Sequence, residues 1–370
     1  MYTIQEVTTS SDLKKFVRFP DKLYRNSGQY VPALHSVEIR ALTRSASLSY
    51  CKHRLWMVKD GKKVVGRICA IINPRYNELY GKKRVRFGWF DCIDDIEVAR
   101  MLIGAAEAWA KEQGMTEIHG PLVYNNIGRQ GMLVEGYENT PPFDCLYNFP
   151  YYNDLVRELG FDKECDWIQY KLVANHGVPD KARRVAKLVS EKYNLHIGKL
   201  DILKKDKEQV RKFFKVYNES FSRVHNFIPL TDAEIDEEAK SIMPLISDKT
   251  SCVLLDEHEE VIGFGVAVPS LSEALKKAKG SLFPFGWFRV SRALRKYETI
   301  DLIVNGVAPE WQNKGISSIY YKEMADRAAR LGSRWAISNP QIEGDTAVNI
   351  WNCYERDHFM RRRCYIKSID

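Results

Sequence analysis

Apolar and polar positions follow the same order in the two halves of the chain. Residues 53–72, HRLWMVKDGKKVVGRICAII, predict two strands joined at an Asp-Gly turn. Residues 250–269, TSCVLLDEHEEVIGFGVAVP, repeat this pattern with a longer turn. A third apolar run follows in each half, FGWFDCI (87–93) in the first and ETIDLIVNGV (298–307) in the second.

Each third run is followed by a segment with a helical period that ends in glycine. These segments are residues 96–114 and 316–332. A fourth apolar run and a short helical stretch then lead to Phe161 in the first half and to Phe359 in the second. The shared order predicts an α/β protein made by tandem duplication of one domain. The alternative interpretation is that any two α/β domains share such an order.

The repeat sets the expected domain boundaries. A chain of 370 residues is longer than one core usually supports, so two domains are expected. We place the first domain at residues 1–172 and the second at 196–370, joined by a linker at 173–195. Hydrophobic residues make up 45% of the chain, which is typical of a globular protein with large cores.

Charge and cysteine usage narrow the class of protein. The formal net charge of +8 is spread along the chain, which favours an anionic ligand or a membrane surface and predicts no nucleic-acid partner. The eight cysteines form no CxxC pair and the histidines show no ligand spacing, so we expect free thiols, a reducing compartment and no metal site. No signal-peptide pattern and no apolar run of about 20 residues is present, so a cytoplasmic protein is expected.

The segment GVAPEWQNKGISS (306–318) connects a predicted strand to a predicted helix. Backbone N–H groups at a helix N-terminus bind anions. Gly315 lets the backbone approach a phosphate, and Ser317 adds a hydroxyl group. Gln312 and Lys314 are long enough to reach phosphate oxygens. The alternative interpretation is that Gly315 is only a turn residue before a helix.

The piece VAPEWQNKGIS resembles the acyl-CoA-binding motif of the GNAT acyltransferase superfamily, V-x-P-x-x-[RQ]-x-x-G-x-[GA], although Ser317 stands where Gly or Ala is usual. Residues 354–359, YERDHF, resemble the YExxGF motif of that family. The resemblance implies an α/β (α+β) fold of two tandem GNAT-like domains, each with a mixed, mostly antiparallel central sheet flanked by helices. It implies acetyl-CoA or a longer acyl-CoA as co-substrate. The residues expected to bind it are Val307, Gln312, Asn313, Lys314, Gly315, Ile316 and Ser317.

The first half has FDCIDDIEV at the corresponding place. Asp91, Asp94 and Asp95 crowd the start of the predicted helix, where carboxylates cap a helix but repel a pyrophosphate. We therefore expect the first half to be a degenerate domain that has lost CoA binding, and the second half to carry it.

Longer stretches resemble a tandem GNAT-like group of bacterial proteins that includes bacterial ceramide synthases. Three of them are FPDKLYRNSGQYVPAL (19–34), GPLVYNNIGRQGMLVEGYENTPP (120–142) and GSLFPFGWFRV (280–290). The resemblance covers nearly the whole chain. It implies an acyl-CoA-dependent N-acyltransferase of lipid metabolism, whose amine acceptor is a long-chain amino lipid.

An insertion at residues 270–298 separates the second and third apolar runs of the second half. Aromatic residues lie beside cations in it, a mixture typical of an element that faces lipid. We expect peripheral contact with the inner face of the membrane; packing between the two domains is the alternative. The apolar residues are Leu282, Phe283, Phe285, Trp287 and Phe288, and Phe285 is also expected to contact the acceptor.

Acyl transfer from a thioester to an amine needs a neutral amine, a hydrogen-bond donor for the oxyanion and a proton for the thiolate. The resemblance implies that the acyl carbonyl meets the third strand near Gly306–Val307 and that Tyr354 donates a proton to the sulfur. Packing on the core is the alternative for Tyr354. Glu298 and Asp301 are candidate bases, and each is also open to a structural role. Cys353 is expected to be a buried thiol.

Residues 120–152 are rich in Asn, Gly, Pro and Tyr, an unusual mixture for a loop of this length. This stretch supplies the other expected acceptor-binding residues, Asn125, Asn126, Arg129, Tyr151 and Tyr152. The alternative is that it only joins the two halves.

Other functions stay open at this point. One is a small-molecule or peptide N-acetyltransferase, and another is a non-catalytic protein that binds CoA or lipid. A transferase that uses aminoacyl-tRNA typically lacks the CoA loop, so residues 312–317 argue against it. The acyl donor is either a CoA thioester or an acyl-carrier-protein thioester.

Overall fold

The computed structural model describes residues 1–369, with the side chains at positions 202, 346 and 347 left aside. The chain divides into two compact units. Unit 1 contains Met1–Ile168, Ser272–Val290 and the C-terminal stretch from Met360. Unit 2 contains Gln169–Leu271 and Ser291–Phe359.

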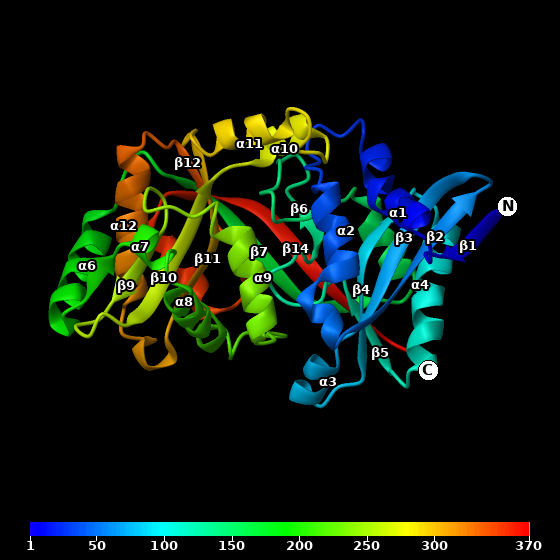
Figure 1. The fold of residues 1–370 in the computed structure, drawn as a ribbon, viewed down its shortest axis with the longest axis horizontal. Helices are drawn as coiled ribbons and strands as arrows, with labels where there is room; N and C mark the ends of the chain where they lie inside the picture. The colour runs from blue at the N-terminus through cyan, green and yellow to red at the C-terminus, as the bar shows by residue number, and fades with distance from the viewer. Residues whose placement is uncertain (370) are drawn as a thin grey trace. The chain divides into compact units, whose positions relative to one another are not determined.

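The sheet of unit 1 has the strand order β1-β2-β3-β4-β5-β14, and β6 pairs with β14 (Figure 1). The strands are β1 (Tyr2–Glu6), β2 (Lys52–Asp60), β3 (Lys63–Ile72), β4 (Arg84–Cys92), β5 (Glu117–Gly120), β6 (Met132–Glu135) and β14 (Arg356–Ser368). The helices are α1 (Ser10–Leu23), α2 (His35–Arg44), η1 (Ala46–Ser49), α3 (Pro74–Tyr80), α4 (Ile96–Glu112), α5 (Tyr151–Glu158), α10 (Ser272–Ala278) and the start of α11 (Gly286–Ala293).

The sheet of unit 2 has the order β8-β9-β10-β11-β12-β7. The strands are β7 (Asp162–Val173, which enters unit 2 at Gln169), β8 (His196–Gly198), β9 (Cys252–Leu255), β10 (Val261–Pro269), β11 (Thr299–Val307), β12 (Trp335–Ile337) and β13 (Gln341–Ile342). The helices are α6 (Asp180–Tyr193), α7 (Leu200–Leu203), α8 (Lys207–Ser220), α9 (Asp232–Ile242), η2 (Pro309–Trp311), α12 (Ser317–Arg330) and η3 (Thr346–Cys353).

Strand register is the same in the two units. The third strands, β4 and β11, each have nine residues. The first three residues of each pair in parallel with the fourth strand, β5 or β12. The last residue of each pairs with a glycine of the preceding strand: Cys92 with Gly66 in unit 1, and Val307 with Gly263 in unit 2. The predicted α/β fold of two similar halves, with mixed and mostly antiparallel strands, is confirmed.

Helices cover both faces of the unit 1 sheet. A Cβ added to Gly66 of β3 would lie 2.8 Å from side-chain atoms of Val98 and Leu102 in α4. The guanidinium group of the next residue, Arg67, lies 5.1 Å from the ring centroid of Phe16 in α1. Because successive residues of a strand point to opposite faces, α4 and α1 lie on opposite faces of this sheet.

The same arrangement holds in unit 2. A Cβ added to Gly265 of β10 would lie 2.7 Å from the sulfur of Met324 in α12. The ring of the preceding residue, Phe264, lies 4.5 Å from the ring of Phe213 in α8. Helices α12 and α8 therefore lie on opposite faces of the unit 2 sheet, and α6 packs beside α12 (Figure 1).

The compact units differ from the expected domain boundaries because two strands pair outside their own half of the sequence. Residues 365–368 of β14 pair with β5, so the end of the chain completes the sheet of unit 1. Residues 171–173 of β7 pair with β12, so a strand of the first half completes the sheet of unit 2. The expected linker at 173–195 also contains helix α6. The boundaries 1–172 and 196–370 stay a prediction about the duplicated sequence.

Residues 272–290 of the insertion at 270–298 belong to unit 1. The hydroxyl group of Ser272 in α10 donates to the carbonyl oxygen of Pro141 at 2.7 Å, and the N–H of His35 donates to the carbonyl oxygen of Gly280 at 2.9 Å. Among the described residues, no helix combines the length and the apolar character needed to cross a membrane.

All eight cysteines are free thiols, as predicted, and six of them are buried. The prediction that Cys353 is buried is wrong, because its side chain is exposed. Helix η3 turns Trp351 into the core of unit 2, and Cys353, two residues further on, lies on the outer side.

Candidate functional site

The loop between β11 and α12 presents a row of backbone N–H groups. Within the described residues, the N–H groups of residues 313–317 donate to no carbonyl oxygen of the chain. Asn313 and Gly315 have left-handed backbones, with φ of 60° and 78°. Gly315 is followed by Ile316 in the right-handed helical region, and this left–right sequence turns neighbouring N–H groups toward one side. The loop therefore has the backbone geometry of an anion site at the N-terminus of a 14-residue helix.

Two side chains of the loop have partners within the protein. The amide nitrogen of Gln312 donates to the carbonyl oxygens of Val307 at 3.0 Å and Ser220 at 3.4 Å, which fastens the loop to the end of β11. The ammonium group of Lys314 lies 4.8 Å from the ring of Trp311 and remains exposed. Lys314 is thus placed to reach an anion, whereas the Gln312 amide braces the loop.

Helix α6 supports this loop, a role that the sequence analysis missed. A Cβ added to Gly315 would lie 3.3 Å from Val189 of α6, so the glycine allows both the left-handed backbone and the close packing of α6. Ile316 is buried beside Val189 and Tyr193. Arg183 forms a two-pronged ion pair with Asp326 of α12. The signal was the helical period of residues 180–193, which the prediction assigned to a linker.

Strand β11 has a free edge beside the loop. Its parallel pairing with β12 ends at Asp301, whereas the strand continues to Val307. Beyond that point, the side chain of Asn305 lies 3.4 Å from that of Asn339 and accepts a hydrogen bond from the hydroxyl group of Tyr320 at 3.2 Å. This opening lies where the acyl carbonyl was expected, and the sequence analysis did not name Asn305, Tyr320 or Asn339.

Tyr354 lies at the edge of an apolar pocket in unit 2, together with Tyr321 of α12 and Trp351 of η3. Burial raises the pKa of Tyr354 to about 12, so its phenol is protonated at neutral pH. A protonated phenol can donate to a departing thiolate. Its ring also packs 6.2 Å from the Trp351 ring, so the expected catalytic role and the expected packing role are compatible.

The two candidate bases lie in different environments. Glu298 is exposed and precedes β11, so it is separated from Val307 by nine strand positions, or about 30 Å. Asp301 lies on β11 where the pairing with β12 ends, and only 1% of its surface is exposed. Of the two, only Asp301 stands next to the opening between the strands.

The corresponding end of β4 in unit 1 is closed by the protein's own side chains. The hydroxyl group of Tyr152 accepts from the N–H of Cys92 at 3.1 Å and lies 2.7 Å from the hydroxyl group of Tyr24. The hydroxyl group of Tyr151 donates to the carbonyl oxygen of Cys92 at 2.7 Å. In unit 2 the carbonyl oxygen of Val307, at the position that corresponds to Cys92, instead accepts from the Gln312 amide at 3.0 Å. The loss of CoA binding in the first half stays a prediction.

Acidic residues at this end of β4 have structural partners. Asp91 is buried and accepts from Arg67 at 2.7 Å and from Tyr24 at 2.9 Å. Asp95 caps α4 by accepting from the N–H of Glu97 at 2.9 Å, as the sequence predicted. Asp94 is exposed.

The expected acceptor-binding residues all belong to unit 1. Asn125 is buried and accepts from the N–H of Ile127 at 3.1 Å, and Asn126 beside it is half-buried. Arg129 donates to the carbonyl oxygen of Phe143. The hydroxyl groups of Tyr151 and Tyr152 are engaged around Cys92, as described above, and Phe285 is exposed. Acceptor binding by these residues stays a prediction.

The insertion presents a large apolar surface to solvent. Phe283 is 83% exposed, Phe285 69%, Trp287 59% and Phe288 55%. Arg289 and Arg292 of α11 are exposed among them. Within unit 1 these rings are therefore not part of the core.

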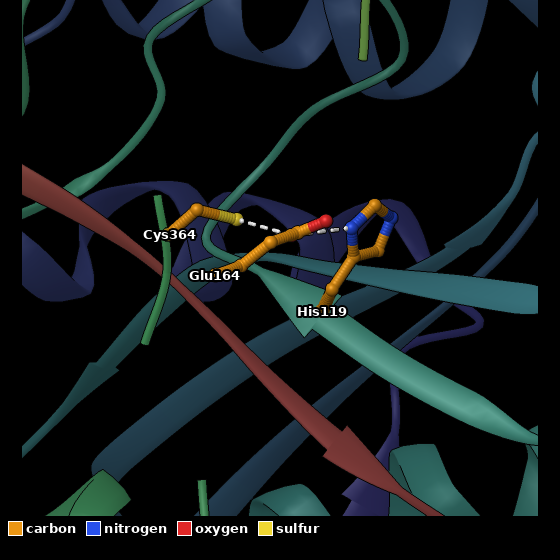
Figure 2. Close-up of side chains that lie close together, drawn as sticks. All are labelled: His119, Glu164 and Cys364. Carbon is orange, nitrogen blue, oxygen red and sulfur yellow. Dashed lines mark hydrogen bonds and ion pairs between the residues drawn. The ribbon is translucent and has the colours of Figure 1, made fainter. Parts of the chain in front are cut away.

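Figure 2 shows a buried cluster of possible metal ligands in unit 1, made by His119 of β5, Glu164 of β7 and Cys364 of β14. A Glu164 oxygen lies 3.0 Å from His119 Nδ1 and 3.2 Å from Cys364 Sγ. The other Glu164 oxygen accepts from Arg84 at 2.8 Å. Burial lowers the pKa of His119 to about 4. Arg86 and Arg84 lower it further, whereas Glu164 raises it. A divalent cation here would face two guanidinium groups, so the geometry favours an internal ion pair over a metal site.

Comparison with known proteins adds to this geometry. No family model matches the chain. The chain is 30% identical over 379 residues to the "Bacterial ceramide synthase" of Caulobacter vibrioides, covering 98% of this chain and 96% of that protein. It is 27% identical over 378 residues to "Protein YghO" of Escherichia coli, covering 99% and 95%. A tandem GNAT protein from the clavulanic acid biosynthesis pathway shares the fold, with a TM-score of 0.59, 9% identity, and coverage of 100% of this chain and 99% of that one.

Proposed function

From its membership of the GNAT superfamily we propose that the chain is an acyl-CoA-dependent N-acyltransferase. Within that superfamily it belongs to the tandem group of bacterial proteins that includes the bacterial ceramide synthase of Caulobacter vibrioides. The acyl group moves from a CoA thioester to an amine. The acceptor is a long-chain amino lipid, in line with the name of that relative.

The observation that carries the proposal is the row of N–H groups at residues 313–317. These groups and the positive end of α12 suit the CoA pyrophosphate, and Lys314 adds an exposed positive charge. The free edge of β11 starts beside this loop and offers backbone groups to the amides of the pantetheine arm. Unit 1 lacks both features, so one donor binds per chain.

Acyl transfer would then proceed by direct attack of the neutral amine on the thioester carbonyl. The backbone of β11 near Gly306 and Val307 stabilises the developing oxyanion. As the carbon–sulfur bond breaks, Tyr354 donates its phenolic proton to the thiolate. Water carries away the proton that the amine nitrogen loses, because Asp301 lies six strand positions, or about 20 Å, from Val307.

A lipid acceptor requires access to a membrane surface. The four exposed aromatic rings at residues 283–288, beside Arg289 and Arg292, suit insertion at an anionic lipid surface. We propose this segment as the peripheral membrane contact of a cytoplasmic enzyme. The amino-lipid acceptor reaches the protein from that surface.

The first test changes one charge at the loop. Ser317→Glu places a carboxylate at the start of α12, as Asp94 and Asp95 do in the first half, and Ser317→Gln is its matched neutral control. A carboxylate at a helix N-terminus stabilises the helix by about 0.3–1 kcal/mol, so the variant is expected to fold. Calorimetric titration with palmitoyl-CoA and acetyl-CoA should show at least a tenfold loss of affinity in Ser317→Glu alone.

Three outcomes would contradict the proposal. If Ser317→Glu and Ser317→Gln bind as the parent protein does, the loop does not hold the pyrophosphate. If the parent protein binds neither thioester, the donor is not a CoA, and acyl-carrier-protein thioesters become the next candidates. Binding without turnover of any amine would instead indicate a non-catalytic CoA-binding protein.

A further inference from the structure

Two of the eight cysteines lie on neighbouring strands, and the proposed acyl transfer uses neither of them. Cys165 belongs to β7 and Cys364 to β14, and both residues are part of unit 1. Cys165 is half-buried, whereas Cys364 is fully buried. The last residue of β7, Val173, donates its N–H to the carbonyl oxygen of Glu355, just before β14 begins, at 3.0 Å. Because the end of β7 meets the start of β14, the two strands run antiparallel.

Side-chain contacts set the register of these strands around the two thiols. The guanidinium group of Arg363 donates to the two oxygens of Asp166 at 2.8 and 2.9 Å. In an antiparallel pair, the residue before Asp166 lies opposite the residue after Arg363, which places Cys165 opposite Cys364. The two thiol groups also interact directly. Opposite residues of such a pair have Cα atoms about 4.5–5.5 Å apart, within the span of about 4.4–6.8 Å that a disulfide bridges.

Glu164 provides an acceptor for the proton of the buried thiol. The S–H of Cys364 donates to a Glu164 oxygen at 3.2 Å, and the same oxygen lies 3.0 Å from Nδ1 of His119 (Figure 2). Arg84 holds the other oxygen of Glu164 at 2.8 Å. Thiol–disulfide exchange requires a thiolate as the attacking group. A carboxylate fixed beside the Cys364 thiol therefore meets this requirement where water has no access.

We propose that Cys165 and Cys364 are a thiol–disulfide site, which closes to a disulfide when a low-molecular-weight disulfide such as oxidised glutathione reaches the half-buried Cys165. The Cys165 thiolate attacks one glutathione sulfur, the glutathione S–S bond breaks, and the first glutathione leaves as a thiolate. Cys364 then gives its proton to Glu164 and attacks the Cys165 sulfur, and the second glutathione leaves. The two cysteines lose two electrons and two protons, and oxidised glutathione gains them as two thiols.

The test uses the full chain with Cys353→Ser as the background, because the exposed Cys353 would also react with glutathione. Each protein is incubated with oxidised glutathione, its remaining thiols are alkylated, and its linked peptides are identified by mass spectrometry without reduction. Cys165→Ser removes the attacking thiol and Cys364→Ser removes the second one. Thermal unfolding of each reduced protein shows which variants fold, and Cys364→Ala replaces Cys364→Ser if the latter does not.

The background protein is expected to form a bridge between Cys165 and Cys364 that dithiothreitol reverses, and oxidation should raise its Tm by at least about 4 °C. Cys165→Ser should leave Cys364 unmodified and show no rise in Tm. Cys364→Ser should stop at a glutathione adduct on Cys165.

Two results would overturn the thiol–disulfide site. One is a background protein that keeps the glutathione adduct on Cys165 as fully as Cys364→Ser does, because Cys364 then does not displace it. The other is a background protein in which both thiols are still alkylated after the incubation. Neither readout uses an acyl thioester, so the site and the proposed acyl transfer stand or fall separately.

Discussion

Tyr152 provides a test of the prediction that unit 1 has no donor site. Its hydroxyl group accepts from the N–H of Cys92 at 3.1 Å, and it lies 2.7 Å from the hydroxyl group of Tyr24 and 3.3 Å from a carboxylate oxygen of Asp91. All four residues are buried. Tyr152→Phe keeps the ring but removes every one of these contacts.

The size of the effect follows from what is left behind. A buried donor that loses its acceptor costs about 1–3 kcal/mol, and the Cys92 N–H has no water-exposed route to a substitute. The lost bond with Tyr24 adds about 1 kcal/mol. We therefore expect Tyr152→Phe to lower the free energy of unfolding by about 2–4 kcal/mol. Tyr151→Phe, which removes one half-buried bond to the Cys92 carbonyl oxygen, should cost about 0.5–1.5 kcal/mol.

Urea unfolding followed by tryptophan fluorescence measures the difference between the two variants, and calorimetry measures their affinity for palmitoyl-CoA. Both variants should bind one donor per chain with the affinity of the parent protein, because the tyrosines close unit 1 and do not bind the donor. A Tyr152→Phe variant that is as stable as Tyr151→Phe would refute the structural role of this hydroxyl group. A second bound CoA per chain, or a lower affinity for the first, would refute the proposal that only unit 2 binds the donor.

Three further predictions concern other groups. The pKa of His119 is about 4 in the folded protein and 6.5 in the unfolded chain, so the unfolded chain binds more protons between these pH values. The free energy of unfolding should therefore fall by about 3 kcal/mol as the pH is lowered from 6.5 to 4. Urea unfolding of His119→Asn should show a shallower pH dependence. Tyr354→Phe should lower kcat by about 10²–10⁴-fold with unchanged palmitoyl-CoA affinity, and an unchanged kcat would exclude Tyr354 as the acid. Because the pKa of Tyr354 is about 12, its ionisation should cause no loss of rate below about pH 11. Replacing Phe285 and Trp287 together by Ala should weaken sedimentation with vesicles containing anionic lipid while leaving acetyl-CoA binding unchanged, and equal sedimentation would exclude the membrane role.

Local pattern was sufficient to predict the elements that form the site. The strands at 52–60, 63–72 and 299–307 and the helix at 317–330 were expected within a few residues, because period and turn chemistry are local properties. The left-handed backbone at Gly315 also agrees with the glycine that the loop requires.

Pairing between distant segments could not be read in the same way. Strands β7 and β14 each carry enough apolar residues to complete either sheet, and nothing in their own sequences says that β14 pairs with β5 or that β7 pairs with β12. The support of Gly315 by Val189 depends on how α6 docks, which is a property of the folded unit. Asn305 and Asn339 meet only because the parallel pairing ends at Asp301.

Strands β4 and β11, the third strands of the two units, share one architecture but have different surroundings. Each has nine residues, pairs in parallel over its first three, and leaves the rest of its edge without a parallel neighbour. In unit 1 the hydroxyl groups of Tyr151 and Tyr152 engage the backbone of Cys92 at the end of that edge, and Asp95 takes the helix N-terminus. In unit 2, within the described part of the chain, the N–H groups of residues 313–317 before and at the start of the helix donate to no carbonyl oxygen. Polar groups of an edge that lack protein partners contribute less to stability than groups that side chains engage. The proposed donor site requires such an open edge in unit 2, and the proposed loss of the site in unit 1 permits side chains to engage the backbone there.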